Sequence, residues 1–384
     1  MCKGQDFIFK YMGNRRIKYF TFHGCIEKGR QRNNSPAADS KTDYIINVLN
    51  RIGYGVDVIS RAPSAENHCL PSSIEYIGNN TYKYFASLSK TYAIVRFINR
   101  WWIGFQFFIW CLINLKKGEH VIVYHSLYFD SAFLNLIKLK KISIIGEIEE
   151  IYQDVSKQSA RKCRNEYRFI EACSKYIFPT QLLDDKLNVF HRPSVIIHGV
   201  YTSETIIENK FSDGKIHVVY GGTLDPNKGG ATAAAAAEYL PSNFHVHICG
   251  FGNPTEIIKV VEDVQSRSKA SVSFEGELKG NTYKRFIQKC HIGLSTQNPD
   301  AAFNATSFPS KILMYLSNGL KVVSINIPAI ASSAVSDNIF FYKEQSPRKI
   351  ANAILEASQK EIHNTTVLSR LDKLFERELR DMLE

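Results

Sequence analysis

The second half of the chain opens with KIHVVYGGTLDPNKGG (residues 215–230), which leads into the alanine-rich run ATAAAAAEYL (231–240). A β-branched, aromatic segment that ends in glycines and precedes strong helix formers predicts a buried strand, a tight turn and a helix. HVHICGFG (245–252) and SVSFEGEL (271–278) predict further strands of the same kind. This alternation predicts a parallel sheet covered by helices, the doubly wound α/β class.

The first half repeats this alternation. Strands are predicted at 17–24, 55–60, 120–126 and 142–150, with an amphipathic helix at 42–53. The polar, turn-rich stretch 202–214 reads as a linker between two such sheets. We therefore expect an N-terminal α/β domain at 1–205, a second at 206–360 and a final amphipathic helix at 361–384.

Composition limits the classes of partner. The 384 residues carry a net charge of +11 and are 44% hydrophobic, which excludes a mainly disordered chain and predicts an anionic partner. The basic residues are spread out without an aromatic–basic recognition motif, so nucleic acid is not the expected partner. The eight cysteines form no CxxC pair and the first twenty residues lack a signal-like apolar run; both point to a cytoplasmic protein.

One uncharged segment stands out, WWIGFQFFIWCLINL (101–115), with basic residues on both sides. Its length is short of the roughly 20 residues that span a bilayer. Two interpretations remain open. It is either a helix buried against a sheet or a helix that lies at a membrane interface, where tryptophan and flanking lysine or arginine are favoured.

The turn after the strand at 215–222 is the first candidate site. Ligands of doubly wound sheets bind beyond the carboxyl ends of the strands, where backbone amides favour phosphate. Gly221, Gly222 and Thr223 could offer such amides and Lys228 a positive charge, although an ordinary strand–turn–helix connection remains open. Gly250, in the next strand's GxG, is a weaker candidate because the third glycine of a dinucleotide fingerprint is missing.

The second candidate site is SFPSKILMYLSNG (307–319), where Pro309 predicts a helix start. Ser307, Ser310 and Lys311 lie at or just before its first turn, where free amides attract anions. A lysine there opposes the helix dipole, which is understandable if it faces a bound anion, or if it is simply solvated.

The order of these motifs over about residues 215–330 resembles the nucleotide-sugar-binding half of retaining GT-B glycosyltransferases of the group 1, or GT4-like, family. The first half resembles that family's acceptor domain more loosely, through VYHS (123–126), EIEEIY (147–152) and IFPTQLLDDKL (177–187). The resemblance implies two Rossmann-like doubly wound domains that face a cleft and a C-terminal helix that crosses back to the first domain.

The resemblance also implies roles for named residues. In the second domain it implies donor contacts for Gly221, Gly222, Thr223, Lys228, Gly250, Glu277, Leu278, Ser307, Ser310 and Lys311. Glu277 and Leu278 match the loop that holds the nucleobase. Near the reacting sugar and the acceptor it implies His125, Glu147, Glu149 and Asn304. The two glutamates could equally form a solvated acidic patch.

This sequence departs from the family at two positions. The family commonly has two glutamates separated by seven residues, and here Thr306 and Met314 stand in their places. A methionine cannot accept hydrogen bonds strongly from ribose hydroxyls. Either Asn304 or Glu277 takes over, or activity is altered, which keeps open a non-catalytic GT-B-like subunit and, less directly, a nucleotide-sugar epimerase.

The resemblance implies an enzyme that moves a sugar from a nucleoside-diphosphate sugar to a lipid-linked saccharide in bacterial surface polysaccharide (O-antigen, capsule or exopolysaccharide) biosynthesis. No metal-binding dyad stands out, so neither a metal nor another cofactor is expected. Such an acceptor implies peripheral contact with the cytoplasmic face of the inner membrane, for which the net charge and the 101–115 segment would be suited.

Overall fold

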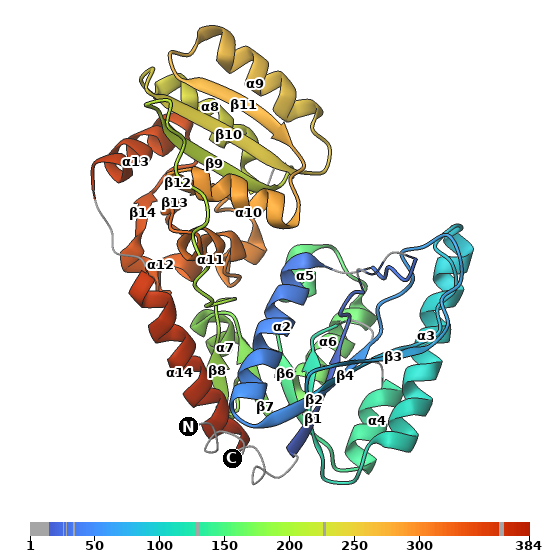
Figure 1. Ribbon diagram of the computed structural model, residues 1–384. Coiled ribbons are helices and arrows are strands. Elements are labelled where there is room, and N and C mark those ends of the chain that lie inside the picture. The colour runs from blue at the N-terminus through green and yellow to red at the C-terminus, as the bar shows by residue number, and fades with distance from the viewer. Residues whose placement is uncertain are drawn as a thin grey trace, which may run out of the picture. The chain divides into compact units, whose positions relative to one another are not determined.

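The computed structural model describes residues 15–25, 27, 29–33, 35–126, 131–225, 228–360 and 365–384. The expected absence of a signal segment therefore falls mainly on residues outside this range. The chain divides into two compact units (Figure 1). One consists of Met1–Ile197 together with Phe375–Glu384, and the other of His198–Leu374.

The first unit is built on an eight-stranded sheet. Its strands are β1 (Arg15–Thr21), β2 (Tyr54–Ser60), β3 (Ser73–Ile77), β4 (Asn80–Tyr84), β5 (His120–Tyr124), β6 (Ser143–Glu147), β7 (Lys175–Phe178) and β8 (Ser194–Ile196). They lie in the order β3-β4-β2-β1-β5-β6-β7-β8, and all neighbours are parallel except β3 with β4. The β3–β4 hairpin was not predicted, and the strand predicted at 142–150 ends at Glu147.

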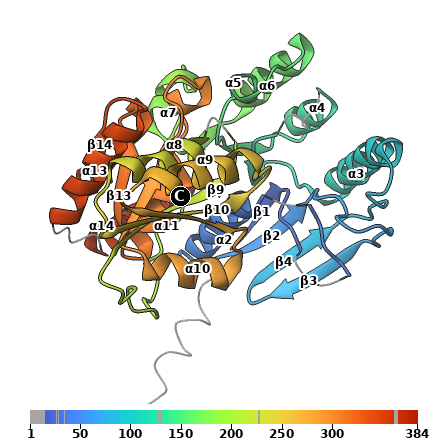
Figure 2. The same ribbon diagram turned by 90° about the horizontal axis from the view of Figure 1, so that it is seen from above.

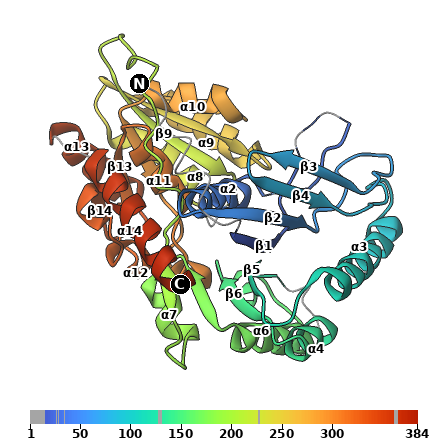
Figure 3. The ribbon, with the colours of Figure 1, turned by 60° about the horizontal axis from the view of Figure 1, so that its bottom comes forward.

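Helices surround this sheet. They are α2 (Pro36–Arg51), α3 (Ala93–Asn114), α4 (Ser131–Leu139), α5 (Tyr152–Val155), α6 (Ala160–Ala172) and α7 (Gln181–Leu187). In the core, the ring of Phe20 from β1 meets Phe107 from α3 edge-on at 5.1 Å between centroids, and Phe133 from α4 at 6.3 Å. Aromatic packing thus fixes α3 and α4 next to each other at the margin of the unit (Figures 1 and 3).

Helix α3 contains the uncharged segment and has two different faces. Asn99, Ile103, Phe107 and Cys111 are buried. The other face leaves large apolar side chains exposed: Ile94, Phe97, Ile98, Trp101, Trp102, Phe105, Ile109, Leu112 and Ile113. None of the helices described is long and apolar enough to cross a membrane. The segment is therefore only half buried, and its outer face stands free along this edge of the unit (Figure 2).

The second unit is built on a six-stranded parallel sheet. Its strands are β9 (Ile216–Thr223), β10 (Phe244–Phe251), β11 (Ser271–Gly276), β12 (Ile292–Ser295), β13 (Lys321–Ile325) and β14 (Ile339–Tyr342). The order is β11-β10-β9-β12-β13-β14, which is the strand order of a Rossmann sheet. The order reverses between β9 and β12, so the carboxyl end of β9 lies at the switch point where ligands bind in this class.

The helical elements of this unit are α8 (Gly230–Ala235), η2 (Ala236–Tyr239), α9 (Thr255–Arg267), α10 (Gly280–Lys289), η3 (Ala302–Ala305), α11 (Ser310–Ser317), α12 (Pro328–Ala331), η4 (Ser336–Asn338) and α13 (Pro347–Gln359). The alanine run is buried at Ala233, Ala234, Ala236 and Ala237. Small side chains let α8 and η2 approach the sheet closely, as the sequence predicts.

The last helix, α14 (Thr365–Leu383), begins in the second unit and ends in the first. The ring of Phe375 stacks on Tyr44 of α2 at 6.0 Å between centroids, and Glu376 accepts a hydrogen bond from Arg51 at 2.7 Å. The expectation that the C-terminal helix returns to the first domain is confirmed.

Candidate functional site

The end of β9 lies at the switch point of the second sheet. The tight turn predicted at Gly221 and Gly222 is wrong, because both glycines belong to β9 and pair with Cys249 and Gly250 of β10. The Gly221 amide donates to the hydroxyl of Tyr315 at 2.8 Å, so it is already used within the protein. Gly222 has a φ of +155°, and a Cβ built there would stand 3.2 Å from Nζ of Lys311. The structure thus places Gly222 of β9 next to the side chain of Lys311, which lies in the first turn of α11.

Lys311 is the central residue of this region. Its Nζ atom is buried and has no hydrogen-bond partner among the described residues, and it lies 4.1 Å from the centre of the Tyr220 ring. Burial, with a contribution from nearby Lys228, lowers the pKa of Lys311 to about 7. The Oγ atom of Ser307 is also buried without a partner within the described structure. A buried donor without an acceptor is unfavourable, so each of these two groups has an unused capacity to bind.

Lys228 places a second cation near the first. Its Nζ atom lies 4.3 Å from the centre of the Phe303 ring. The Tyr220 hydroxyl donates to the carbonyl oxygens of Thr223 and Lys228 at 3.0 and 3.1 Å, so it holds both ends of the connecting loop. Pro226 and Asn227 of that loop lie outside the described residues. We define Gly222, Lys228, Ser307 and Lys311 as the cradle, which includes two lysine side chains.

The remaining donor candidates are placed differently. Gly250 is a packing position, because a Cβ there would stand 1.9 Å from the carbonyl oxygen of Gly222. Asn304 is buried, and its amide donates to Asn298 at 2.6 Å. Glu277 is exposed and paired with Lys279 at 3.1 Å, and the adjacent Leu278 is half-buried. Ser310, the first residue of α11, is exposed.

In the first unit, Glu147 and Glu149 follow one another at the carboxyl end of β6. Glu147 is fully buried; its Oε2 accepts a hydrogen bond from Tyr19, and its Oε1 has no partner among the described residues. Burial, and then the nearby Glu149, raise the pKa of Glu147 to about 8. Glu149 instead pairs with the buried Lys41, which also donates to the carbonyl oxygen of Ile197 at 3.1 Å. The two glutamates therefore have different partners, and neither belongs to a solvated acidic patch.

His125 follows β5 and is buried. Its ring stacks on Phe169 at 5.8 Å, and its Nε2 atom lies 3.4 Å from Oε1 of Glu166. Burial lowers the pKa of His125 to about 4, so the imidazole is neutral near pH 7. Glu166 was not predicted, because it stands among the many charged residues of α6 and nothing in the sequence distinguishes it. Its Oε1 accepts from the Tyr152 amide at 2.8 Å, so His125 and Glu166 connect β5, α5 and α6.

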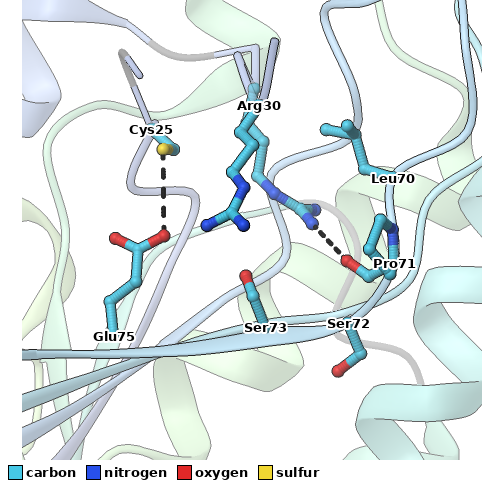
Figure 4. Close-up of a pocket in the computed structure, with 8 residues that line it drawn as sticks. Cys25, Arg30, Leu70, Pro71, Ser72, Ser73 and Glu75 are labelled. Carbon is cyan, nitrogen blue, oxygen red and sulfur yellow. Dashed lines mark hydrogen bonds between the residues drawn. The ribbon is translucent and has the colours of Figure 1, made fainter. Parts of the chain in front are cut away.

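The first unit also has a small pocket of about 130 Å³ between the loop after β1 and the start of β3 (Figure 4). It is lined by Cys25, Arg30, Arg32, Leu70, Pro71, Ser72, Ser73 and Glu75. Arg32 is buried and donates to the carbonyl oxygen of Pro71 at 3.4 Å, and Cys25 faces Glu75 with 4.0 Å between Sγ and Oε1. No sequence motif pointed to this pocket, because its residues come from two separate polar stretches.

Two groups of side chains in the described structure have the chemistry of metal ligands. Cys25, Glu27 and Glu75 form one, and Glu27 is exposed and paired with Arg30 at 3.6 Å. His217, His245 and His247 form the other, in the second sheet.

Comparisons with known proteins bear on the fold. No protein-family profile and no curated sequence matches the chain. Among solved structures, the trehalose-6-phosphate synthase from E. coli bound with UDP-2-fluoro glucose has a TM-score of 0.66 at 9% identity, over 96% of this chain and 97% of that one. The enzyme from Burkholderia multivorans has a TM-score of 0.63 at 11% identity, over 96% and 95%. The enzyme from Burkholderia xenovorans in complex with glucose-6-phosphate has a TM-score of 0.61 at 10% identity, over 96% of this chain and 100% of that one.

These likenesses show the fold: two parallel-sheet α/β domains of the GT-B class, as the sequence predicts. At such low identities they do not carry the narrower group 1 label or an acceptor over to this chain.

Proposed function

We propose that this chain is a retaining glycosyltransferase of the group 1 type, which moves a sugar from a nucleoside-diphosphate sugar to a lipid-linked saccharide of a surface polysaccharide. The observation that carries the proposal is the cradle. A buried ammonium without a partner among the described residues, that of Lys311, lies beside Gly222 at the end of β9, the switch point of a Rossmann sheet. The buried hydroxyl of Ser307, also without a described partner, stands four residues before Lys311. This arrangement suits the diphosphate of a nucleotide sugar.

The cradle also supports the chemistry of transfer. Negative charge develops on the diphosphate as the bond to the sugar breaks. Lys228 and Lys311 would stabilise that charge from fixed positions, which is the most effective form of electrostatic catalysis. In this proposal these two cations are sufficient for the leaving group. The E. coli neighbour, which binds UDP-2-fluoro glucose, is consistent with a donor of this class.

Helix α3 supports a lipid-linked acceptor. Its exposed apolar face is flanked by Arg96, Arg100, Lys116 and Lys117, which are all exposed. Aromatic and apolar side chains between basic ones suit a helix that lies in the headgroup region of an anionic membrane. Attachment through α3 would place the first unit at the cytoplasmic face of the inner membrane, where lipid-linked acceptors are found.

A second candidate acceptor is a sugar phosphate. The pocket in Figure 4 is lined by Arg30 and Arg32, and the Burkholderia xenovorans neighbour is a complex with glucose-6-phosphate. The pocket's volume of about 130 Å³ suits a phosphate group rather than a whole sugar. This candidate keeps the same donor reaction and changes only the group that receives the sugar.

A donor screen followed by turnover tests the proposal. Purified chain is screened against UDP-, GDP-, ADP- and dTDP-sugars by thermal shift, and we expect one family of donors to raise the melting temperature. The best donor is then incubated with membrane-extracted lipid-linked saccharides or with glucose-6-phosphate, and nucleotide release is measured. Release with the lipid fraction alone supports the proposal. Release with glucose-6-phosphate alone favours the second candidate, and binding without release favours a non-catalytic subunit.

A further inference from the structure

Three histidines of the second unit lie together near the amino-terminal ends of two adjacent strands. His217 of β9 and His245 of β10 are direct register partners, and His247 is two residues further along β10. Because side chains alternate along a strand, all three imidazoles project from the same face of the sheet. The sheet edge that they occupy is opposite to the carboxyl ends that carry the cradle.

Hydrogen bonds orient each ring. Nδ1 of His217 and Nε2 of His247 are 2.8 Å apart and face one another. On their outer sides, Nε2 of His217 is 2.8 Å from Oδ1 of Asp213, and Nδ1 of His247 is 2.8 Å from Oε1 of Glu275.

His245 completes the set, since its Nε2 is 2.8 Å from the Ser273 hydroxyl. Each imidazole therefore has one nitrogen within hydrogen-bond distance of an oxygen.

We propose that His217, His245 and His247 form a binding site for one divalent transition-metal ion of the Zn²⁺ class, with Asp213, Glu275 and Ser273 orienting the rings. One ring nitrogen of each histidine lies within 4.8 Å of one nitrogen of the others. Three imidazoles with an open fourth position are a recurrent zinc ligand set, and an oxygen on the outer nitrogen fixes the tautomer that binds metal.

The distances and charges agree with this assignment. Metal bonds of 2.0–2.1 Å in a tetrahedral site require ligand nitrogens roughly 3.3 Å apart. The distance of 2.8 Å between Nδ1 of His217 and Nε2 of His247 would then increase by a few tenths of an ångström. The ion would take the place of the proton that these two nitrogens share. Asp213 and Glu275, each 2.8 Å from an outer ring nitrogen, would balance the two positive charges of the ion.

The surroundings keep the ligands rigid. His217 and His247 are buried and His245 is half-buried. Phe211 stacks on the His217 ring at 4.2 Å. A metal here would tie β9, β10 and the segment before β9 together, independently of the donor reaction.

Metal titration of the full chain tests the site. Chelator-treated protein is titrated with Co²⁺, followed by visible absorption, and with Zn²⁺, followed by calorimetry, elemental analysis and thermal shift. We expect one ion per chain, tetrahedral Co²⁺ bands and a raised melting temperature. H245Q should lose the bound ion, the Co²⁺ bands and the rise in melting temperature. H120Q, which changes an exposed histidine of the other unit, should retain these three signals. Asp213→Asn, which keeps every ligand, should weaken affinity by about 10- to 100-fold.

Two outcomes would overturn the proposal. One is the absence of a stoichiometric ion in the unaltered chain, which would leave a pair of histidines that share a proton. The other is metal binding that H245Q and D213N leave unchanged, which would show that the ion binds elsewhere. Should H245Q fail to fold, D213N and H247Q give the same comparison. Neither outcome affects the donor proposal, whose screen does not depend on metal.

Discussion

The ammonium group of Lys311 lies over the ring of Tyr220, 4.1 Å from its centre, while the hydroxyl of that tyrosine ties Thr223 to Lys228. One tyrosine at the end of β9 therefore positions both cations of the cradle, one through its ring and one through its hydroxyl. Gly222 keeps the space beside Nζ open, because a Cβ there would approach it to 3.2 Å. In the proposed function, these contacts would hold Lys228 and Lys311 in place for a diphosphate.

Replacing Lys311 should lower donor affinity without lowering the stability of the free protein. In Lys311→Met we expect donor affinity to fall by about 10- to 100-fold, because a charged hydrogen bond contributes about 1.5–3 kcal/mol. The melting temperature of the free protein should hold or rise, since a buried ammonium without a partner in the described structure is removed. Calorimetry with the best donor of the screen and thermal unfolding measure the two effects. Lys259→Met, at an exposed lysine of α9, is the control; equal affinities in both variants would refute the cradle assignment.

Donor binding should also depend on pH. Since the pKa of Lys311 is about 7 in the free protein, the side chain loses its charge above that pH. A bound diphosphate favours the ammonium form, so binding takes up a proton, and affinity should fall by up to about tenfold per pH unit above neutrality. A nucleotide sugar is the right probe, because its diphosphate does not titrate in this range. Calorimetry in buffers of different ionisation enthalpy measures the proton uptake, which Lys311→Met should abolish.

Glu147 should make the first unit more stable at low pH than at high pH. Its pKa is about 8 in the folded chain against an ordinary value of 4.5, so the stabilisation is complete below 4.5 and is lost as the pH rises towards 8. The glutamine of E147Q cannot ionise. Between pH 4.5 and 8, the unfolding free energy of E147Q should therefore rise relative to that of the unaltered chain by about 1 kcal/mol per pH unit. Urea unfolding at about pH 5 and about pH 8 measures this difference.

Glu149 offers the contrast. E149Q leaves the buried Lys41 without its carboxylate, so it should destabilise the chain near neutral pH. A stability difference for E147Q that does not change with pH would contradict the buried neutral carboxyl.

The fold was largely predictable because its strands are buried on both sides. Runs such as HVVYGG and HVHICGFG are almost continuously apolar or small, which is typical of parallel strands beneath helices. The β3–β4 hairpin was missed for the opposite reason: SIEYI and NTYKY mix polar and apolar residues and lie at the edge of the sheet. Strand ends were overestimated where a β-branched or aromatic run continues into a loop, as at Ile148 after β6.

The site was predictable where a motif marks it and not where partners are distant. Pro309 and the glycines of β9 drew attention to residues that the structure places close together, since helix starts and strand ends have local signals. The burial of Glu147 and its pairing with Tyr19 depend on residues 128 positions apart, so no local pattern could show them. HVH in β10 was the one local signal of the histidine cluster, because a spacing of two places both rings on one face.

Gly250 should be essential for folding rather than for donor contact alone. A Cβ there would stand 1.9 Å from the carbonyl oxygen of Gly222, a backbone atom that cannot move without breaking the pairing of β9 with β10. We expect Gly250→Ala to cost several kcal/mol of unfolding free energy, in the upper range for single substitutions. Gly104→Ala in α3 is the control. Its nearest neighbour would be 3.7 Å away, and alanine is about 1 kcal/mol better than glycine in a helix. Similar unfolding midpoints for both variants would contradict this explanation.

The exposed face of α3 should bind membranes through its aromatic side chains. Trp101 and Phe105 are 66% and 59% exposed and lie one helical turn apart, so Trp101→Ser with Phe105→Ser removes much of the apolar area without touching the buried face. We expect the unaltered chain to float with vesicles that contain anionic lipid, and the double variant to float at least several-fold less.

Added salt should weaken the binding, because the basic residues around the helix contribute, but it should not abolish it. Tyr76→Ser is the control, since this side chain of β3 is 78% exposed and lies outside α3. Circular dichroism must show both variants folded. If the double variant floats as well as the unaltered chain, α3 does not face lipid. The sugar phosphate would then be the better-supported acceptor.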